Sequence, residues 1–229
     1  LSARMNTATE VGGDFYDVVS LDNQKYLLVI GDVSGKGTSA AFYMAQCISL
    51  IRFSCQFSQD PREILIRLNR YFSDPKIDKQ IFVTAVIGLL DPQKHQVTLL
   101  RPGHNQPLFI PADQSRAIQE LKLPGIGIGL EREGKIFEKT LGDTVIKLKT
   151  GDTLFFYSDG LVDAYSNGHS TSAGKADFYG DERLIDLLQN LRGKLPTEIQ
   201  ERVTAELAAF YGNSPLIDDM TMLIVQRTK

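Results

Sequence analysis

The chain has 229 residues, of which 42% are hydrophobic and 23% are charged, as in ordinary soluble domains. Its net charge of −3 and the lack of a basic block argue against a nucleic-acid partner, and the sequence shows neither a bilayer-spanning apolar run nor a signal peptide. Cys47 and Cys55 are separated by a predicted helical rise of roughly 12 Å, too far for a disulfide, so we expect a reducing cytoplasm. Because no apolar run is long enough to cross a bilayer, we expect no membrane contact by this domain.

The first predicted elements are two strands that each carry an aspartate beside glycines. Phe15–Val19 alternates like a strand, Lys25–Ile30 is rich in β-forming residues, and Asp22-Asn23 between them favours a turn. The resulting hairpin would bring Asp14, which follows two glycines, close to Asp32, which enters a glycine-rich turn. Two carboxylates at one place repel each other unless a proton or a cation lies between them. This is the first indication of a metal site.

The glycine-rich turn after Asp32 admits other interpretations. Residues 31–38 resemble a phosphate-binding loop, but only three residues separate Gly31 from Gly35-Lys36, where the motif needs four. Gly12-Gly13-Asp14 falls short of the dinucleotide-cyclase motif, because Phe15 stands where an acid is required. An ordinary glycine-rich hairpin with surface acids stays open at this point.

Further elements are predicted in chain order from periodicity and from helix start and stop signals. Asp60-Pro61, with Glu63 at the third helical position, is a strong helix start. The predicted elements are a helix at Thr38–Gln56, a helix that starts at Pro61 and has its stop signal at Asp74-Pro75, a strand hairpin at Ile81–Leu90 and Val97–Leu100, short strands at Leu108–Ile110 and Ile118–Leu123, a loop at Pro124–Leu130, a second strand pair at Thr144–Leu148 and Thr153–Tyr157, a surface loop or flap at Ser166–Gly180, helices at Asp181–Leu191 and Pro196–Tyr211, and a strand at Met220–Val225.

Acidic residues stand beside turns at the ends of several predicted strands. Widely separated carboxylates without a matching His or Cys set suit hard cations such as Mg²⁺ or Mn²⁺, and two such ions roughly 3.5–4 Å apart suit phosphoester hydrolysis. The three histidines show no metal-ligand spacing, and neither Ser34 nor Ser158 lies in a nucleophile elbow. The candidate acids are Asp14, Asp32, Asp159 and the pair Asp218-Asp219.

Five motifs occur in a characteristic order: G-G-D-F-Y-D (12–17), G-D-V-S-G-K-G (31–37), G-H-N (103–105), S-D-G-L (158–161) and D-D-M-T (218–221). Together they resemble the metal-dependent PPM protein phosphatases, and most closely the bacterial SpoIIE/RsbU-type branch, over about Ala3 to Gln226. This resemblance implies an α+β fold, a four-layer α-β-β-α sandwich of two antiparallel sheets flanked by helix pairs. We expect one domain over residues 1–229, the C-terminal part of a longer signalling protein.

The resemblance also implies roles for individual residues. Asp32 would bridge two Mg²⁺ or Mn²⁺ ions, the Val33 carbonyl would help to hold one of them, and Asp14 would act largely through metal-bound water. Asp159 and Asp218 would bind the other ion. Asp219 is kept as a second candidate ligand, although it would rather orient its neighbour. Asp17 is either a support for the ligands or an exposed strand acid.

Two motifs depart from the family pattern. The arginine that precedes the first acidic motif in the eukaryotic enzymes and binds the substrate phosphate is replaced by Thr7-Ala8-Thr9-Glu10. Lys36 is therefore the candidate for substrate binding, and a solvated turn lysine is the alternative. The usual N-A-G-H-N loop begins here with Arg101-Pro102, so we assign His104 no catalytic role.

The function implied by the resemblance is hydrolysis of a phosphoserine or phosphothreonine protein by attack of metal-bound water. The expected partner is a phosphorylated protein, plausibly a STAS-domain anti-sigma-factor antagonist, with an upstream sensor or receiver domain in the same chain. The oligomeric state is open between monomer and homodimer. Two alternatives remain: a catalytically silent phosphoprotein-binding module, and a nucleotide-binding enzyme that uses residues 31–38, which the failed motif spacing opposes.

Overall fold

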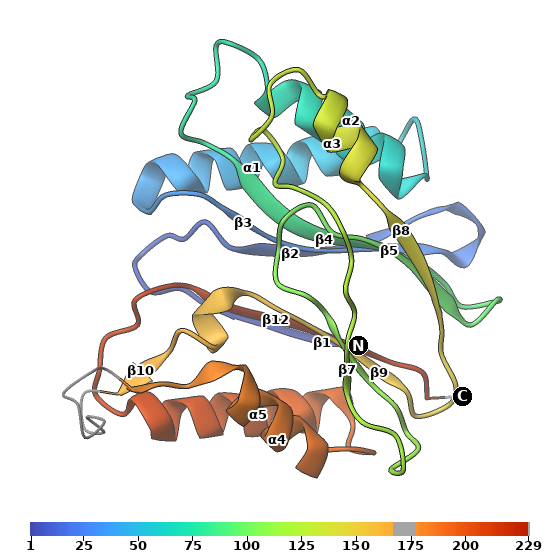
Figure 1. Cartoon of the computed structure of the whole chain (residues 1–229), viewed down its shortest axis with the longest axis vertical. Helices are drawn as coiled ribbons and strands as arrows, with labels where there is room; N and C mark the ends of the chain where they lie inside the picture. The colour runs from blue at the N-terminus through green and yellow to red at the C-terminus, as the bar shows by residue number, and fades with distance from the viewer. Residues whose placement is uncertain (167–176, 229) are drawn as a thin grey trace.

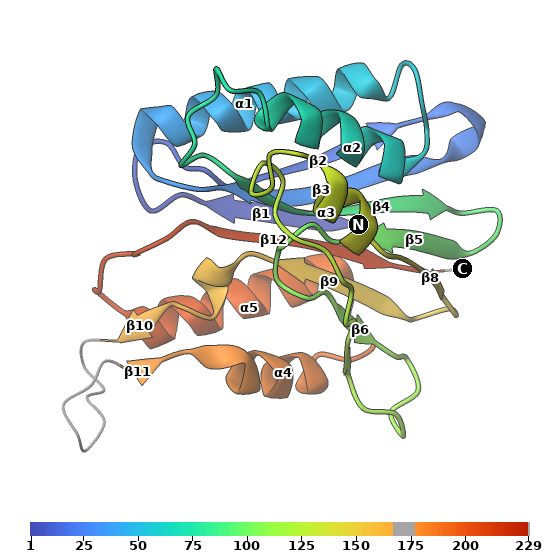
Figure 2. The ribbon, with the colours of Figure 1, turned by 45° about the horizontal axis from the view of Figure 1, so that its top comes forward.

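The structure is a computed structural model that describes residues 1–166 and 177–228. Two five-stranded antiparallel sheets lie face to face, and a pair of long helices covers the outer face of each sheet (Figure 1). A second view, turned by 45°, shows the same four layers (Figure 2). The predicted four-layer sandwich is therefore confirmed.

The first sheet has the order β2-β3-β4-β5-β8, and its strands are Phe15–Ser20 (β2), Tyr26–Val33 (β3), Val83–Asp91 (β4), Gln96–Leu100 (β5) and Asp143–Lys147 (β8). A single 3₁₀ turn, η1 (Asp22–Gln24), joins β2 to β3. The helices on this sheet are α1 (Gly37–Ser54) and α2 (Pro61–Phe72), and the short α3 (Lys135–Thr140) contributes to the same core.

The second sheet has the order β1-β12-β9-β6-β7, and its strands are Ser2–Asn6 (β1), Met220–Gln226 (β12), Thr153–Tyr157 (β9), Leu108–Ile110 (β6) and Gln119–Glu120 (β7). It is covered by α4 (Gly180–Asn190) and α5 (Pro196–Tyr211). A 3₁₀ turn, η2 (Asp159–Leu161), follows β9, and a separate two-stranded ribbon consists of β10 (Tyr165–Ser166) and β11 (Asp177–Phe178).

The layers form because the central strands are apolar on both faces. Successive side chains of a strand point to opposite faces of its sheet. In β3, Leu27 and Val29 pack toward α1 and α2, whereas Leu28 and Ile30 pack between the two sheets. The side chains of the near-continuous apolar strands therefore form one core between the sheets and contribute to one core under each helix pair.

The start of α2 follows the predicted capping chemistry. The Asp60 side chain accepts a hydrogen bond of 2.9 Å from the Arg62 amide, and Pro61 occupies the first helical position. A cap of this kind stabilises a helix by about 1 kcal/mol. The predicted start of α2 and both predicted boundaries of α5 are confirmed.

The predicted pairing of the strands at Thr144–Leu148 and Thr153–Tyr157 is wrong. β8 pairs with β5 in the first sheet, whereas β9 pairs with β12 and β6 in the second, so the turn between them crosses from one sheet to the other. The buried Asp152 holds this crossing, because its carboxylate accepts hydrogen bonds of 2.8 Å from the amides of Ala112 and Lys149. Two neighbouring β-rich segments look like a hairpin in sequence whether or not they pair.

Two elements have no counterpart in the prediction. β1 is a mixed segment that becomes a strand by pairing with β12, from Ser2 opposite Ile224 to Asn6 opposite Met220. α3 is only 6 residues long and follows Gly134, which has a positive φ of 79°. Neither is long enough to show a clear periodicity.

The flap predicted at Ser166–Gly180 falls mainly on residues 167–176, which lie outside the described residues. Its described ends form the antiparallel β10–β11 ribbon. Across residues 1–166 and 177–228, none of the helices combines the length and the apolar character that a membrane crossing requires.

Candidate active site

One edge of the sandwich collects the ends of strands from both sheets. The β2–β3 hairpin is confirmed, and it pairs Phe15 with Gly31, so that Asp14 and Asp32 lie at the same end of the first sheet. From the second sheet, Asp159 follows β9 and the Asp218-Asp219 pair precedes β12. Thus the five acids predicted from separate motifs meet in one region, where the charges of Asp159, Asp218 and Asp219 all act on Asp32.

Glycine is required where the loop before Asp14 meets β3. The Val33 amide donates a hydrogen bond of 3.2 Å to the Gly13 carbonyl. A Cβ atom on Gly13 would lie 2.5 Å from the Val33 carbonyl oxygen and 2.9 Å from Asp32 Oδ1. The glycine therefore permits the close approach that holds Asp14, Asp32 and the Val33 carbonyl together.

The carboxyl group of Asp14 is buried and incompletely paired. Its Oδ2 atom has no hydrogen-bond partner among the described residues. The pKa of Asp14 is raised to about 8, mainly by burial and further by the charges of Asp32 and Asp219, while the hydroxyl groups of Thr221 and Ser158 act in the opposite direction. A buried carboxylate without a partner is unfavourable, so this oxygen is suited to a proton or a cation.

Asp32 is half-buried and surrounded by like charges. Burial and then the charges of Asp159, Asp218 and Asp219 raise its pKa to about 7, and the charge of Lys36 opposes them. The pKa of Asp159 is also raised, first by partial burial of its carboxyl group and then by the charge of Asp218. Repulsion among these side chains would be relieved by a cation.

Asp163 belongs to the same group but was not predicted. It follows Asp159 by four residues across the turn η2, and its amide donates a hydrogen bond of 2.8 Å to the Asp159 carbonyl. Its pKa is raised by partial burial and by the charges of Asp218 and Asp181. The sequence signal that could have identified Asp163 is its spacing of four residues from Asp159, which one helical turn would bring to the same side.

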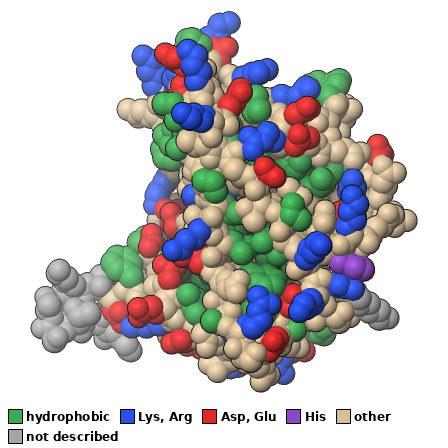
Figure 3. All heavy atoms as spheres, turned by 45° about the vertical axis from the view of Figure 1, so that its right-hand side comes forward, with side chains coloured by type: hydrophobic (Ala, Val, Ile, Leu, Met, Phe, Trp, Pro, Cys, Tyr) green, Lys and Arg blue, Asp and Glu red, His purple; other side chains and the backbone are tan. Residues whose placement is uncertain are grey.

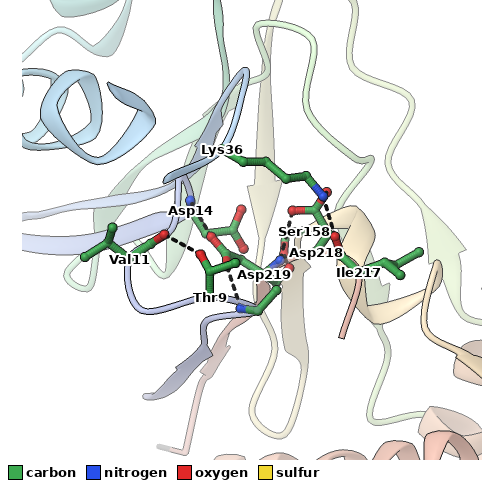
Figure 4. Close-up of polar contacts among 9 residues, drawn as sticks. Thr9, Val11, Asp14, Lys36, Ser158, Ile217, Asp218 and Asp219 are labelled. Atoms are coloured by element: carbon green, nitrogen blue, oxygen red, sulfur yellow. Dashed lines mark hydrogen bonds and ion pairs between the residues drawn. The ribbon is translucent and has the colours of Figure 1, made fainter. Parts of the chain in front are cut away.

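Asp219 has different partners from Asp218 (Figure 4). Its buried carboxylate accepts hydrogen bonds from the amides of Ala8, at 2.8 Å, and Asp14, at 3.3 Å. A Cβ atom on Gly12 would lie only 1.7 Å from Asp219 Oδ2, so glycine is needed there. Asp219 therefore fastens the loop that carries Asp14, which agrees with an orienting role.

Asp218 is paired with the candidate substrate-binding residue. The Lys36 ammonium group lies 3.4 Å from Asp218 Oδ2 and also donates a hydrogen bond to the Ile217 carbonyl (Figure 4). Lys36 is exposed but is not simply solvated, because it places a positive charge among the carboxylates.

Two other residues named from the sequence are paired with groups other than these acids. Asp17 is buried and accepts two hydrogen bonds, of 2.7 and 2.8 Å, from Arg52 of α1, so it is not an exposed strand acid. His104 is buried, its Nδ1 atom lies 2.9 Å from the Thr84 hydroxyl, and burial lowers its pKa to about 4.

The acids fit a divalent cation by charge and chemistry. In the described part of the chain, no group of three or more His, Cys, Asp or Glu side chains is placed so that it could hold a metal ion. However, Asp14 Oδ2 is unpartnered, and the Lys36 ammonium group stands beside Asp218 where a positive charge relieves repulsion. Carboxylate and carbonyl oxygens are the ligands that Mg²⁺ and Mn²⁺ prefer.

Comparison with known families adds a classification to this geometry. The family model described as Stage II sporulation protein E (SpoIIE) matches residues 22–228. The chain belongs to the SpoIIE family. This SpoIIE-family chain is 26% identical to Protein IcfG of Synechocystis over 99% of its own length, and 21% identical to phosphoserine phosphatase RsbP of Bacillus subtilis over 69%. It spans only 38% of the length of each of these relatives.

The SpoIIE-family chain also resembles solved structures of phosphatase domains. It matches the SiaA-PP2C domain of Pseudomonas aeruginosa with a TM-score of 0.82 and 22% identity, over 98% of this chain and 85% of that one. The PP2C phosphatase domain of Bacillus subtilis SpoIIE matches with a TM-score of 0.74 and 23% identity, over 98% of this chain and 62% of that one. RsbX in complex with magnesium matches with a TM-score of 0.66 and 15% identity, over 98% of this chain and 92% of that one. The fold is that of the PP2C-type phosphatase domains.

Proposed function

We propose that this domain removes phosphate from phosphoserine or phosphothreonine on a partner protein in a bacterial signalling pathway. The observation that carries the proposal is the convergence of Asp14, Asp32, Asp159 and Asp218, from four separate motifs, at one edge of the sandwich. Membership of the SpoIIE family and the similarity to a phosphoserine phosphatase support the same reaction class.

Two Mg²⁺ or Mn²⁺ ions would be held by these four aspartates together with the Val33 carbonyl. When bound, such ions lower the pKa of a water molecule and neutralise the charge that develops on the phosphoryl oxygens. The chain itself keeps the Asp14 and Asp32 carboxyl groups partly shielded from bulk water, which strengthens their attraction for a cation. The solved complex of RsbX with magnesium supports the use of a divalent ion.

Asp219 would contribute by position. Its carboxylate holds the amides of Ala8 and Asp14, and its carbonyl accepts a hydrogen bond of 3.2 Å from Ser158, which precedes Asp159. It thereby connects the loop that carries Asp14 to the strand end that carries Asp159. We assign Asp219 to this connection and Asp218 to the ions.

The substrate is proposed to be a folded phosphoprotein, plausibly a STAS-domain anti-sigma-factor antagonist. No arginine occupies the position that anchors phosphate in related enzymes, so contact between the proteins would supply much of the affinity. We further propose that this is one catalytic domain of a longer cytoplasmic protein, controlled by an upstream sensor or receiver domain.

A silent phosphoprotein-binding module is the second candidate. It is favoured by the Lys36–Asp218 ion pair. The lysine neutralises part of the negative charge of the acids, so the site needs a metal ion less, and without a metal ion it would not hydrolyse the phosphate.

Hydrolysis of p-nitrophenyl phosphate, measured with saturating Mn²⁺ or Mg²⁺ and with chelator, separates the two functions. We expect metal-dependent turnover that falls by about a hundredfold or more in Asp32→Asn, because a charge-stabilising group is lost. Asp113→Asn, at an exposed turn, is the control and should keep wild-type turnover. Absence of turnover with every divalent ion, in a protein that still binds phosphoproteins, would favour the silent module.

A further inference from the structure

A cavity of about 490 Å³ lies on the outer side of the second helix pair, between α4 and α5 and beside β11. Tyr179, Leu187 and Phe210 give it an apolar and aromatic lining. The rings of Tyr179 and Phe210 meet edge to face with centroids 5.3 Å apart. Asp186 of α4 and Glu206 of α5 add carboxylates from two different helices.

The cavity already contains one guanidinium group of the chain itself. Arg183 lies over the Phe210 ring, 5.1 Å from its centroid, and forms hydrogen bonds of 3.1 Å with both carboxylate oxygens of Asp177. It also donates to the carbonyl oxygens of Phe178, at 2.6 Å, and Tyr179, at 3.2 Å. An aromatic face with a bidentate carboxylate is the environment that guanidinium groups prefer.

The remaining acids of the cavity are uncompensated. Asp177 neutralises Arg183, whereas neither Asp186 nor Glu206 forms an ion pair within the described part of the chain. Tyr179 is 4% exposed, and its hydroxyl group forms no hydrogen bond with another described residue. Burial raises the pKa of Tyr179 and the negative charge of Glu206 raises it further, which places that carboxylate near the phenol.

The segment that lines the cavity is hydrogen-bonded to the segment that follows η2. The Tyr179 amide donates a hydrogen bond of 2.8 Å to the Ala164 carbonyl, and the Gly180 amide donates one of 2.9 Å to the Val162 carbonyl. Both acceptors lie just after η2, which begins at Asp159. In the space-filling view, acidic side chains gather on the left-hand side of the molecule (Figure 3).

We propose that the cavity between α4 and α5 binds an arginine side chain of the phosphoprotein substrate, at the carboxylates of Asp186 and Glu206 and beside the Tyr179 hydroxyl group. The inference rests on the proposed function and specifies how the domain recognises its partner. An arginine is favoured over a lysine because its planar group pairs with carboxylates in a bidentate manner. A substrate held there would present its phosphoserine to the acids near Asp159, because the Tyr179 and Gly180 amides bond the carbonyl groups that follow η2.

The test uses peptides with one phosphoserine, a glycine–serine spacer of about 4 to 20 residues and one arginine, each matched by a peptide with uncharged citrulline in place of arginine. At the spacer length that lets the arginine reach the cavity, we expect kcat/KM to rise about tenfold, because the arginine binds the cavity intramolecularly once the phosphoserine is bound. The citrulline peptides should show no such rise. The double variant Asp186→Asn/Glu206→Gln should lose this rise and keep the turnover of p-nitrophenyl phosphate. Glu182→Gln, at an exposed position of α4, is the matched control and should keep the rise.

Equal turnover of arginine and citrulline peptides at every spacer length would overturn the docking proposal while leaving the phosphatase proposal intact. Fluorescence anisotropy of the labelled peptides provides a readout that does not depend on turnover. Arginine peptides should bind the wild-type domain and the Asp32→Asn variant several-fold more tightly than citrulline peptides do. If the double variant binds both peptides as the wild type does, the cavity is not the binding site.

Discussion

The ammonium group of Lys36 lies 3.4 Å from the carboxylate of Asp218 and bonds the Ile217 carbonyl as well. Lys36 follows β3 of the first sheet and Asp218 precedes β12 of the second, so the pair links the two sheets across the candidate site. The side chains are 63% and 44% exposed, respectively, and an exposed pair of this kind stabilises a protein by at most about 1 kcal/mol. Such a weak pair can exchange for a cation or a phosphate.

Replacing Lys36 by Gln should therefore strengthen metal binding. The variant no longer offers a competing positive charge to Asp218, so the dissociation constant for Mn²⁺, measured by calorimetry, should fall by up to about fivefold. Lys135→Gln removes the surface ion pair with Glu133 and should leave the constant unchanged. If Lys36 also binds the substrate phosphate, its loss should raise KM for p-nitrophenyl phosphate. Weaker Mn²⁺ binding in Lys36→Gln would contradict the competition.

Asp219 and Asp218 should differ sharply as stability determinants. Asp219→Asn exchanges one carboxylate oxygen for an amino group, so one of the amides of Ala8 and Asp14 loses its acceptor. We expect the free energy of unfolding, measured by urea denaturation in chelator, to fall by about 1–3 kcal/mol. Asp218→Asn, at a half-exposed position, should change it by less than about 1 kcal/mol. Equal losses in both variants would refute the different roles assigned to the pair.

The positions of Asp14 and Asp32 could be predicted because a hairpin with a short turn fixes its own register. The roles of Asp218 and Asp219 could not be separated in that way. Adjacent residues of the same type look alike in sequence, and only tertiary contacts give Asp219 its two amides and Asp218 its lysine. Asp17 shows the same limit, since its partner Arg52 lies 35 residues away on α1.

Long-range pairing set the limit for the fold as well. The helices α2 and α5 carry their start signals locally, at Asp60-Pro61 and Pro196. The destination of β9 depends instead on β12, more than 60 residues later in the chain. In the sequence, Asp186 and Glu206 are likewise ordinary polar positions of two amphipathic helices. Only the packing of α4 against α5 shows that they line one cavity.

Removing one of the crowded carboxylates should stabilise the protein when no divalent ion is bound. Asp32→Asn deletes a charge that lies among Asp159, Asp218 and Asp219. At pH 8 in chelator, we expect its free energy of unfolding to exceed that of the wild type by about 1 kcal/mol or more. With saturating Mn²⁺ the order should reverse, because the variant binds the ion less tightly and gains less from it. A variant that is less stable than the wild type in chelator would show that Asp32 serves packing rather than a cation.

His104 should make stability depend on pH. Burial lowers its pKa from 6.5 to about 4, so the imidazole is neutral in the folded chain and takes up a proton on unfolding at mildly acidic pH. Its contribution to stability is therefore complete above pH 6.5 and is lost as the pH falls toward 4.

Between pH 7.5 and pH 5, this contribution amounts to about 2 kcal/mol. His104→Asn keeps a polar group beside Thr84 but cannot titrate, so the variant should lose about that much less stability than the wild type over the same range. The difference is measured by urea denaturation of both proteins at the two pH values, in chelator, so that the carboxylates contribute equally to each. His95→Asn, at an exposed position, should follow the wild type. Parallel pH profiles for wild type and His104→Asn would show that the folded chain accepts the proton without penalty.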